Sequence, residues 1–282
     1  MRVFLTGARG QLGRALQTAL QHQTVITGDR PAFDLTDGAR VRAAILAARP
    51  DIVIHAAAHT DVDGCERDPA LAYRVNALGT RHVAAACQEV GAALVYLSTD
   101  YVFDGQAQTP YHEFARPNPI NVYGASKLAG EQAVMAMVPR HYIVRTAWVY
   151  GAPDRRSFVN TILRLARERE VLEVVTDEVS TPTYAPDLAR AIARLIEQPF
   201  YGVYHLVNEG YCSRYDLAGA VVRLAGLAAT IRPITTAEFQ ARSPLPARRP
   251  AFSALQNFCA AELGIRLRPW PDALAEYLCS LR

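Results

Sequence analysis

Short apolar runs and longer helical patterns alternate along the first half of the chain. Each apolar run has the length of a buried strand, and Pro50 and Gly91 end the second and third helical stretches. Strands that are separated by helices at this spacing predict βαβ units, and therefore a doubly wound parallel sheet with helices on both faces. The predicted strands cover 2–7, 24–29, 51–58, 93–100 and 142–151, and the first three helices cover 11–21, 38–50 and 69–91.

Beyond residue 150 the alternation loosens. Residues 157–170 and 185–198 have helical patterns, 202–208 has a strand pattern, and prolines gather at 233–250. We therefore expect residues 1–150 to form the parallel-sheet domain. We expect 151–282 to form mainly a smaller C-terminal lobe, with segments that return to the sheet.

Composition and charge narrow the class of protein. Half of the 282 residues are hydrophobic and a fifth are charged, which is typical of a globular chain. The net charge of +3 is too small to indicate a nucleic-acid partner, and the basic cluster at 247–250 is better interpreted as a local anion contact or a solvated turn. No apolar stretch approaches the ~20 residues of a membrane helix, and the first residues lack the pattern of a signal peptide.

The five cysteines are scattered and never form a Cys-x-x-Cys pair. This usage is typical of reduced thiols, and it argues against a disulfide scaffold or a structural zinc site. We therefore expect a cytoplasmic protein without a membrane anchor. His55 and His59 lie four residues apart, but they span a strand end and a loop, so we expect no metal site there.

A glycine loop follows the first strand. Gly7, Gly10 and Gly13 open the helix that comes next, and a helix N-terminus with glycines in front of it suits a pyrophosphate. Asp29 lies at the end of the second strand, where a carboxylate can accept hydrogen bonds from a ribose 2′-hydroxyl. Arg30 could instead meet a 2′-phosphate. The sequence therefore predicts a Rossmann-type dinucleotide site and leaves both NADH and NADPH open.

Tyr123 and Lys127 share one face of a helical segment, because a four-residue step nearly completes a turn. An ammonium near a phenol favours the phenolate, so Lys127 would lower the pKa of Tyr123 toward the range of an acid–base catalyst. Thr99 ends the fourth strand, and its hydroxyl would lie at the edge of the sheet where ligands of open α/β folds bind.

This constellation resembles the extended short-chain dehydrogenase/reductase superfamily, and within it the dTDP-4-dehydrorhamnose reductase family. The resemblance extends from Gly7 to the segment 248–255. Sugar-nucleotide 4,6-dehydratases resemble the same pattern but carry an acidic residue where Tyr101 stands. Glu113 and Arg249-Pro250 also fit the reductase pattern. The motifs that carry the resemblance are GARGQLG (7–13), AAAHTDVDGCE (56–66), STDYVFDG (98–105), NVYGASKLAGE (121–131) and RTAWVYG (145–151).

The resemblance implies reduction of the C4 keto group of dTDP-4-dehydro-L-rhamnose by NADPH or NADH, with Tyr123 as proton donor. It implies that Lys127 binds the nicotinamide ribose, that Thr99 donates to the reacting oxygen, and that the C-terminal lobe binds substrate. The implied cofactor-binding residues are Gly7, Gly10, Gln11, Leu12, Asp29, Arg30, Asp34, Leu35, Ala56, Ala57, Ala58, Thr60, Tyr123 and Lys127. The implied substrate-binding residues are Val62, Thr99, Asp100, Tyr101, Trp148 and Arg249.

Some members of this family bind Mg²⁺ across a dimer interface through a glutamate in the first helix. Here that position reads Arg14-Ala15-Leu16, without a carboxylate. The sequence therefore leaves a monomer and a different homodimer open. Two alternatives to the main interpretation also stay open. One is a reductase or epimerase of another nucleotide sugar. The other is a non-catalytic NADP-binding regulatory subunit resembling the β subunit of methionine adenosyltransferase.

Overall fold

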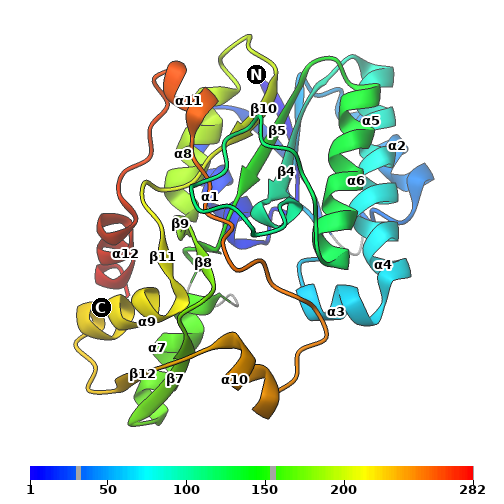
Figure 1. The fold of residues 1–282 in the computed structure, drawn as a ribbon. Coiled ribbons are helices and arrows are strands. Elements are labelled where there is room, and N and C mark those ends of the chain that lie inside the picture. Colours follow the sequence, from blue (N-terminus) through cyan, green and yellow to red (C-terminus); the bar gives the residue numbers. More distant parts are fainter. Residues whose placement is uncertain (30–32, 153–156, 282) are drawn as a thin grey trace.

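A six-stranded sheet forms the centre of the molecule (Figure 1). The computed structural model describes residues 1–29, 33–152 and 157–281. The strand order is β10-β5-β4-β3-β1-β2, and every neighbouring pair in this sheet is parallel, so the predicted doubly wound parallel sheet is confirmed. The strands are β1 (Arg2–Thr6), β2 (Thr24–Gly28), β3 (Ile52–His55), β4 (Ala93–Thr99), β5 (His141–Thr146) and β10 (Gly202–His205).

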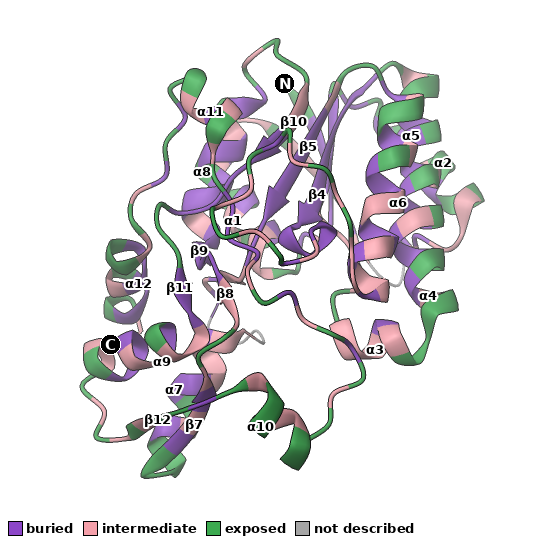
Figure 2. Ribbon diagram, viewed as in Figure 1, coloured by how far each residue is buried: buried purple, intermediate pink, exposed green. Residues whose placement is uncertain are grey.

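Helices cover both faces of this sheet, which explains why its central strands read as continuous apolar runs. Every residue of β3 and β4 is buried, and Figure 2 shows these strands enclosed between helices. One face packs against α1 and α8, and the other packs against α2, α5 and α6. These helices are α1 (Gln11–Ala19), α2 (Gly38–Ala48), α5 (Gly79–Val90), α6 (Val122–Met137) and α8 (Ala185–Leu195).

The helix predicted over 69–91 is three segments in the structure. These are α4 (Pro69–Tyr73), a π-helical turn η1 (Arg74–Leu78) and α5, and the short helix α3 (Val62–Arg67) precedes them. The backbone widens at Asn76, whose carbonyl oxygen accepts hydrogen bonds from the hydroxyls of Thr80 and Tyr96. Its side-chain amide meanwhile bonds both the backbone of His59 and the Ser126 hydroxyl. A local π-bulge thus ties the loop after β3 to α6.

The strand predicted over 142–151 is interrupted at Trp148. β5 ends at Thr146, and Trp148 adopts a φ of 43°, in the left-handed region. The chain then forms β6 (Val149–Tyr150), which pairs with β9 (Thr183–Tyr184) instead of continuing the central sheet. A single strand over the whole range is therefore wrong, because the backbone turns out of the sheet at this residue.

Residues of the second half build a second core below the sheet edge in Figure 1. The sequence pattern identified α7, α8 and β10, and it missed the other elements of this half. Besides α8, β9 and β10, this half contains α7 (Phe158–Glu168), β7 (Val171–Val175), β8 (Val179–Ser180), β11 (Cys212–Ser213), α9 (Arg214–Ala225), β12 (Thr230–Ile234), α10 (Thr236–Arg242), α11 (Phe258–Glu262) and α12 (Trp270–Cys279).

A long connection, residues 243–257, runs from α10 back to the sheet and joins the two halves; we call it the strap (Figure 1). The strap contacts the first half through Arg248, whose carbonyl accepts from Asn121, and through a bridge between Leu255 and Tyr111. Glu113 lies beside it, and its carboxylate accepts from the backbone nitrogens of His205 and Cys259. Among the described residues, no helix is both long enough and apolar enough to cross a membrane.

Candidate active site

The glycine loop lies against the end of β3. Gly7 has a φ of 71°, and a Cβ added there would lie 2.8 Å from the backbone nitrogen of Ala57. A Cβ at Gly13 would lie only 2.1 Å from the Gly7 carbonyl oxygen, so α1 starts in direct contact with the loop. Gly10 caps α1 without a side chain, which leaves the backbone at the helix start open to a ligand. The predicted residues Gly7, Gly10 and Ala57 therefore come together.

Two other predicted residues at this loop face in different directions. Gln11 accepts a hydrogen bond of 3.4 Å from the backbone nitrogen of Ala152, which lies just after β6. Leu12 packs against the core of the sheet. Gln11 therefore links the glycine loop to the point where the chain leaves the sheet.

The expected adenosine end of the site lies beside β2. Asp29 follows this strand, and Arg30 lies outside the described residues. Asp34 accepts hydrogen bonds from Thr36, which turns the backbone, and Leu35 is buried with its carbonyl oxygen accepting from His82. The sequence reasoning missed Arg9, which lines one pocket together with Asp29.

A buried histidine fixes the loop that contains Ala56, Ala58 and Thr60. His55 hydrogen-bonds Thr6 at 2.8 Å and Thr80 at 3.2 Å, and the Thr6 hydroxyl accepts from the backbone nitrogen of Ala57. Burial, with a smaller contribution from Lys127, lowers the pKa of His55 to about 3, so the ring is neutral. Within the part of the chain that the structure describes, no group of three His, Cys, Asp or Glu side chains could hold a metal ion.

Tyr123 lies in the first turn of α6, directly against the turn that follows β4. Asn121 caps α6 by accepting from the backbone nitrogen of Gly124 at 2.8 Å. A Cβ at Gly124 would lie 2.0 Å from the carbonyl oxygen of Tyr101, so only glycine lets the two segments meet. The rings of Tyr101 and Tyr123 pack edge to face at 5.9 Å. The two phenol rings are therefore in contact just after β4.

Thr99 completes this set. Its hydroxyl accepts from the backbone nitrogen of Tyr101 at 3.2 Å, and the turn after β4 thereby holds it at the strand end. Burial raises the pKa of Tyr123 above its ordinary value, and the Thr99 side chain opposes that rise through a hydrogen bond. Tyr123 therefore stays a protonated phenol across the neutral range.

Lys127 lies one turn further along α6, but its ammonium points to β4. Nζ donates to the carbonyl oxygen of Leu97 at 2.6 Å and lies 4.1 Å from the centre of the Tyr96 ring. Burial lowers the pKa of Lys127 to about 7, against an opposing effect of Glu131. The sequence-based reasoning expected Lys127 to act on the Tyr123 pKa. In this structure that pKa responds to burial, Thr99, Asp100 and Cys65.

Asp100 is turned into the protein. One carboxylate oxygen accepts from Ser180 at 3.0 Å and from Ser253 at 2.5 Å, and the other accepts from Thr99 at 3.1 Å. Burial raises the pKa of this carboxyl group, and these hydroxyls counteract the rise. Asp100 thus joins the turn after β4 to β8 and to the strap. This contact network is a feature that sequence reasoning missed.

Arg249 is also engaged within the protein. Its guanidinium donates to both carboxylate oxygens of Asp63, at 2.8 Å and 2.5 Å, and these contacts join the strap to α3. This ion pair holds the pKa of Asp63 below its usual range. Val62, the first residue of α3, is half-buried beside this pair. Sequence reasoning singled out Arg249 for an anion and gave no signal for its partner Asp63.

Trp148 carries an arginine on its ring. The Arg214 guanidinium lies 3.6 Å from the centre of the Trp148 ring, and Arg214 also lowers the pKa of the nearby Tyr101 phenol against the rise caused by burial. The Arg214 guanidinium is therefore near both the Trp148 ring and the Tyr101 phenol. The sequence offered no signal for Arg214, since it lies at the start of a helix that the pattern did not predict.

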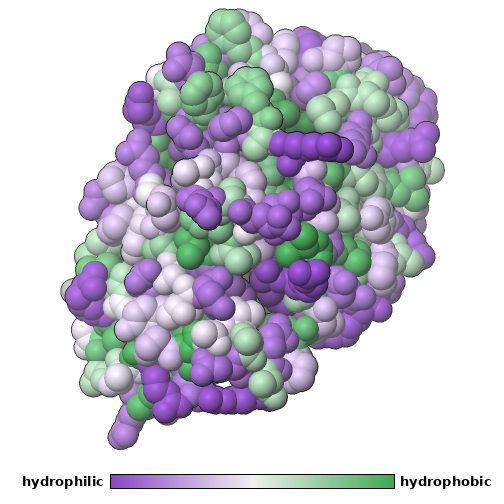
Figure 3. Space-filling model, in the orientation of Figure 1, coloured by the Kyte–Doolittle hydropathy of each residue, from purple (hydrophilic) through white to green (hydrophobic). Residues whose placement is uncertain are grey.

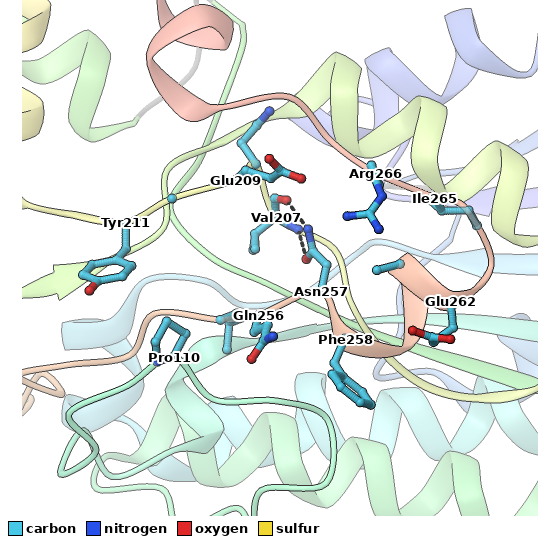
Figure 4. Close-up of a pocket in the computed structure, with 14 residues that line it drawn as sticks. Pro110, Val207, Glu209, Tyr211, Gln256, Asn257, Phe258, Glu262, Ile265 and Arg266 are labelled. Carbon is cyan, nitrogen blue, oxygen red and sulfur yellow. Dashed lines mark hydrogen bonds between the residues drawn. The ribbon is translucent and has the colours of Figure 1, made fainter.

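A pocket elsewhere on the molecule is formed by the chain after β10, the end of the strap and α11 (Figure 4). Asn257 bonds the backbone of Val207 inside it. Phe258 lines the pocket and contacts the exposed Phe114. The face of the molecule in Figure 3 mixes hydrophobic and hydrophilic residues. None of the predicted site residues is among the described residues that line this pocket, so we place the candidate active site at the glycine loop and α6.

Known proteins resemble this chain over nearly its whole length. A family model described as RmlD substrate binding domain matches residues 1–282. The chain is 42% identical to a dTDP-4-dehydrorhamnose reductase of Mycobacterium tuberculosis, over 99% of this chain and 93% of that protein. It is 38% identical to a dTDP-4-keto-6-deoxy-D-glucose reductase of Streptomyces niveus, over 98% of this chain and 96% of that protein.

A solved structure resembles the whole fold. The crystal structure of dTDP-4-dehydrorhamnose reductase from Bacillus anthracis in complex with NADP has a TM-score of 0.94 to this chain. The two sequences are 41% identical, and the match covers 99% of each chain. This similarity therefore includes both the sheet and the second half of the molecule.

Proposed function

The chain belongs to the RmlD substrate binding domain family, and we propose that it reduces the C4 keto group of dTDP-4-dehydro-L-rhamnose to give dTDP-L-rhamnose. More broadly, it is a sugar-nucleotide oxidoreductase that uses NADPH or NADH. The observation that carries the proposal is the meeting of Thr99, Tyr101 and Tyr123 at the end of β4 and the start of α6, in a chain that also has a close-packed glycine loop after β1.

The glycine loop fits a dinucleotide. Side chains at Gly7 or Gly13 would collide with neighbouring backbone, so glycine at these two positions lets the loop and the start of α1 pack closely and leaves the backbone there uncovered. The backbone N–H groups at the start of α1 suit the negative charge of a pyrophosphate. Asp29 would accept from the adenosine ribose, and the loop of Ala56 to Thr60 would line the nicotinamide. The reduced nicotinamide, when bound, supplies the hydride.

The residues of the chain supply the proton and the charge stabilisation. Tyr123 donates its phenolic proton to the alkoxide that forms at C4, and its raised pKa keeps that proton in place before the reaction. Thr99 exchanges its hydrogen bond to Asp100 for one to the same oxygen as negative charge develops there. Lys127, fixed against Leu97 at the base of the site, binds the nicotinamide ribose.

Tyr101 and Asp100 favour reduction over dehydration. A sugar-nucleotide dehydratase needs a carboxyl group, at the position where Tyr101 stands here, so that a sugar hydroxyl group can be protonated and leave as water. A phenol is a much weaker acid than a carboxyl group; an alkoxide takes a proton even from a phenol, whereas a departing hydroxyl group needs the stronger acid. Asp100 accepts hydrogen bonds from the hydroxyls of Ser180 and Ser253, so its carboxylate is directed into the protein and does not serve as this acid. Tyr101 therefore acts as a binding surface for the sugar.

The lobe formed by residues 151–282 provides the other wall of the substrate site in this proposal. Trp148 marks the point where the chain enters that lobe, and its ring contacts the sugar nucleotide. Arg249 offers a guanidinium whose planar fork matches the oxygens of a diphosphate. Binding of the diphosphate would compete with Asp63 for this guanidinium.

The relative from Streptomyces niveus is named for a different 4-keto sugar, and this favours a second candidate substrate, dTDP-4-keto-6-deoxy-D-glucose. Both sugars present a ketone at C4, so the same Thr99–Tyr123 chemistry would reduce either one. The choice between them depends on the residues that contact the rest of the ring.

The test is oxidation of NADPH and of NADH, followed at 340 nm, with each of the two keto sugars generated enzymatically in place. We expect dTDP-4-dehydro-L-rhamnose to give the higher kcat/KM and dTDP-L-rhamnose as product. Turnover of dTDP-4-keto-6-deoxy-D-glucose alone would transfer the assignment to that sugar. Cofactor binding without turnover of either sugar would contradict the proposal and favour a regulatory subunit.

A further inference from the structure

Trp148 is held in a backbone conformation that tryptophan rarely adopts. Its φ of 43° lies in the left-handed region, where a side chain with a Cβ is strained unless its surroundings hold it. This residue stands between β5 and β6, where the chain leaves the central sheet. This backbone conformation sets the direction of the indole ring. A group that holds the ring therefore also determines its orientation.

Arg214 is the group packed on that ring. Its guanidinium carbon lies 3.6 Å from the centre of the Trp148 ring and 4.7 Å from the centre of the Phe158 ring. A guanidinium stacked between aromatic rings contacts both by cation–π attraction and by dispersion. The Trp148 ring is therefore covered on one side by a planar cation, and the residue as a whole stays half-buried.

The arginine is itself anchored on rigid elements. Its backbone nitrogen donates to the Glu178 carbonyl oxygen at 3.0 Å, and its side chain pairs with the Glu178 carboxylate at 3.6 Å. Ser213 and Asp216 form a capping box at the start of α9, which fixes the helix turn that carries Arg214. Arg214 and Glu178 side chains are each only 16% exposed, so this ion pair is largely shielded from water.

This anchor is connected to the reaction site. Ser213 and Val179 pair in the small β8–β11 sheet, and the next residue of β8, Ser180, donates to Asp100 in the turn that carries Thr99 and Tyr101. One continuous set of contacts thus runs from the base of the site to Arg214 and on to Trp148.

We propose that Arg214 is a positioning residue for substrate binding, which holds the Trp148 ring in its left-handed orientation and leaves the opposite side of the ring for the sugar nucleotide. This inference rests on the proposed function, because Trp148 is the substrate contact that it positions. Arg214 acts through the ring of Trp148 and has no part in the proton or hydride transfer.

The chain contains two tryptophans, Trp148 and Trp270. In a Trp270→Phe background, the fluorescence of Trp148 alone therefore reports its surroundings. We would compare Arg214→Gln and Arg214→Lys with Arg223→Gln, a matched control because Arg223 is an exposed arginine in the last turn of the same helix. The measurements are emission wavelength, acrylamide quenching, thermal unfolding, and kcat and KM for the keto sugar.

We expect Arg214→Gln to shift the Trp148 emission to longer wavelength and to increase acrylamide quenching about twofold, in the protein without ligands. KM for the sugar nucleotide should rise roughly tenfold, with kcat changed less than about threefold. Arg214→Lys should behave more like Arg214→Gln than like wild type, because an ammonium lacks the planar stacking face. Arg223→Gln should leave all four readouts unchanged.

Unchanged emission and quenching in both Arg214 variants would overturn the inference, whatever happens to activity. A large loss of kcat together with a loss of thermal stability would also overturn it, since that pattern indicates only a structural role. The fluorescence readout requires no turnover. If neither keto sugar were reduced while the emission still shifted, the proposed function would fail and the role of Arg214 in holding Trp148 would stand.

Discussion

Replacing Lys127 by methionine should abolish most activity and yet stabilise the folded protein at low pH. Burial lowers the pKa of Lys127 from 10.5 to about 7, so below pH 7 the folded protein carries a charge that burial disfavours. At ~1.4 kcal/mol for each pH unit, this difference corresponds to about 5 kcal/mol. Methionine loses the hydrogen bond to Leu97, which costs ~1–3 kcal/mol, and the contact with the Tyr96 ring, which costs ~1 kcal/mol. We expect a net gain of roughly 1–3 kcal/mol at pH 6.

The change with pH of the stability difference between variant and wild type is a sharper test than its value at one pH. The energies of the lost contacts cancel when two pH values are compared. Between pH 7 and 10.5 the unfolded chain still binds the proton while the folded protein does not, so wild-type stability rises with pH. The Lys127→Met variant lacks this rise. Its advantage over wild type should therefore shrink by about 2 kcal/mol between pH 7 and pH 9.

Urea unfolding of both proteins at pH 6, 7, 8 and 9 gives the difference directly. Lys127 is the only lysine in the chain, so ¹³C-lysine-labelled protein gives a single side-chain signal whose titration reports the pKa itself. We expect that signal to titrate near pH 7 without ligands. A lysine signal that titrates near pH 10, together with a stability difference that does not change with pH, would refute the reasoning.

Three further changes test other parts of the site. Tyr123→Phe should lower kcat by about 10²–10⁴-fold with nearly normal cofactor binding, because it removes a proton donor and little volume; unchanged turnover would contradict its role as the acid. Asp63→Asn should release Arg249 from its ion pair and lower KM for the sugar nucleotide several-fold at low salt, whereas a higher KM would mean that the pair only holds the strap to α3. Arg9→Gln should reduce the ratio of kcat/KM for NADPH to that for NADH roughly tenfold, since Arg9 lines the pocket of Asp29; a constant ratio would exclude Arg9 from the 2′-phosphate.

The central sheet could be predicted from sequence because its inner strands are buried on both faces. Residues 93–99, for example, are entirely buried, so this strand is a continuous apolar run in the sequence. A helix lies between each such run and the next, which makes the runs easy to distinguish. The second half lacks such a signal. Its strands β6, β8, β9 and β11 have two residues each, and they pair with partners that lie far along the chain. No periodicity develops over two residues.

The same distinction holds for the site. Gly7 to Gly13 and Tyr123 to Lys127 are close in sequence, so their spacing alone indicates their chemistry. Asp63 and Arg249 are 186 residues apart, and Asp100 and Ser253 are 153 residues apart, so only the folded chain brings each pair together.

Side-chain direction could not be predicted either. The sequence places Lys127 on the same helix face as Tyr123. However, the carbonyl oxygen of Leu97 in β4 attracts the ammonium, and burial then becomes the main influence on both pKa values. A spacing argument identifies which residues share a face, and the packing of the neighbouring strand decides what they contact.

The most direct test of the central claim follows the hydride into the product. The protein would be incubated with dTDP-4-dehydro-L-rhamnose and NADPH that carries deuterium on one or the other face of the nicotinamide C4. We predict dTDP-L-rhamnose with one deuterium at C4 of the sugar, from only one of the two labelled cofactors, as seen by NMR. A reduced sugar without deuterium at C4 from either cofactor, or no reduced sugar at all, would contradict the account.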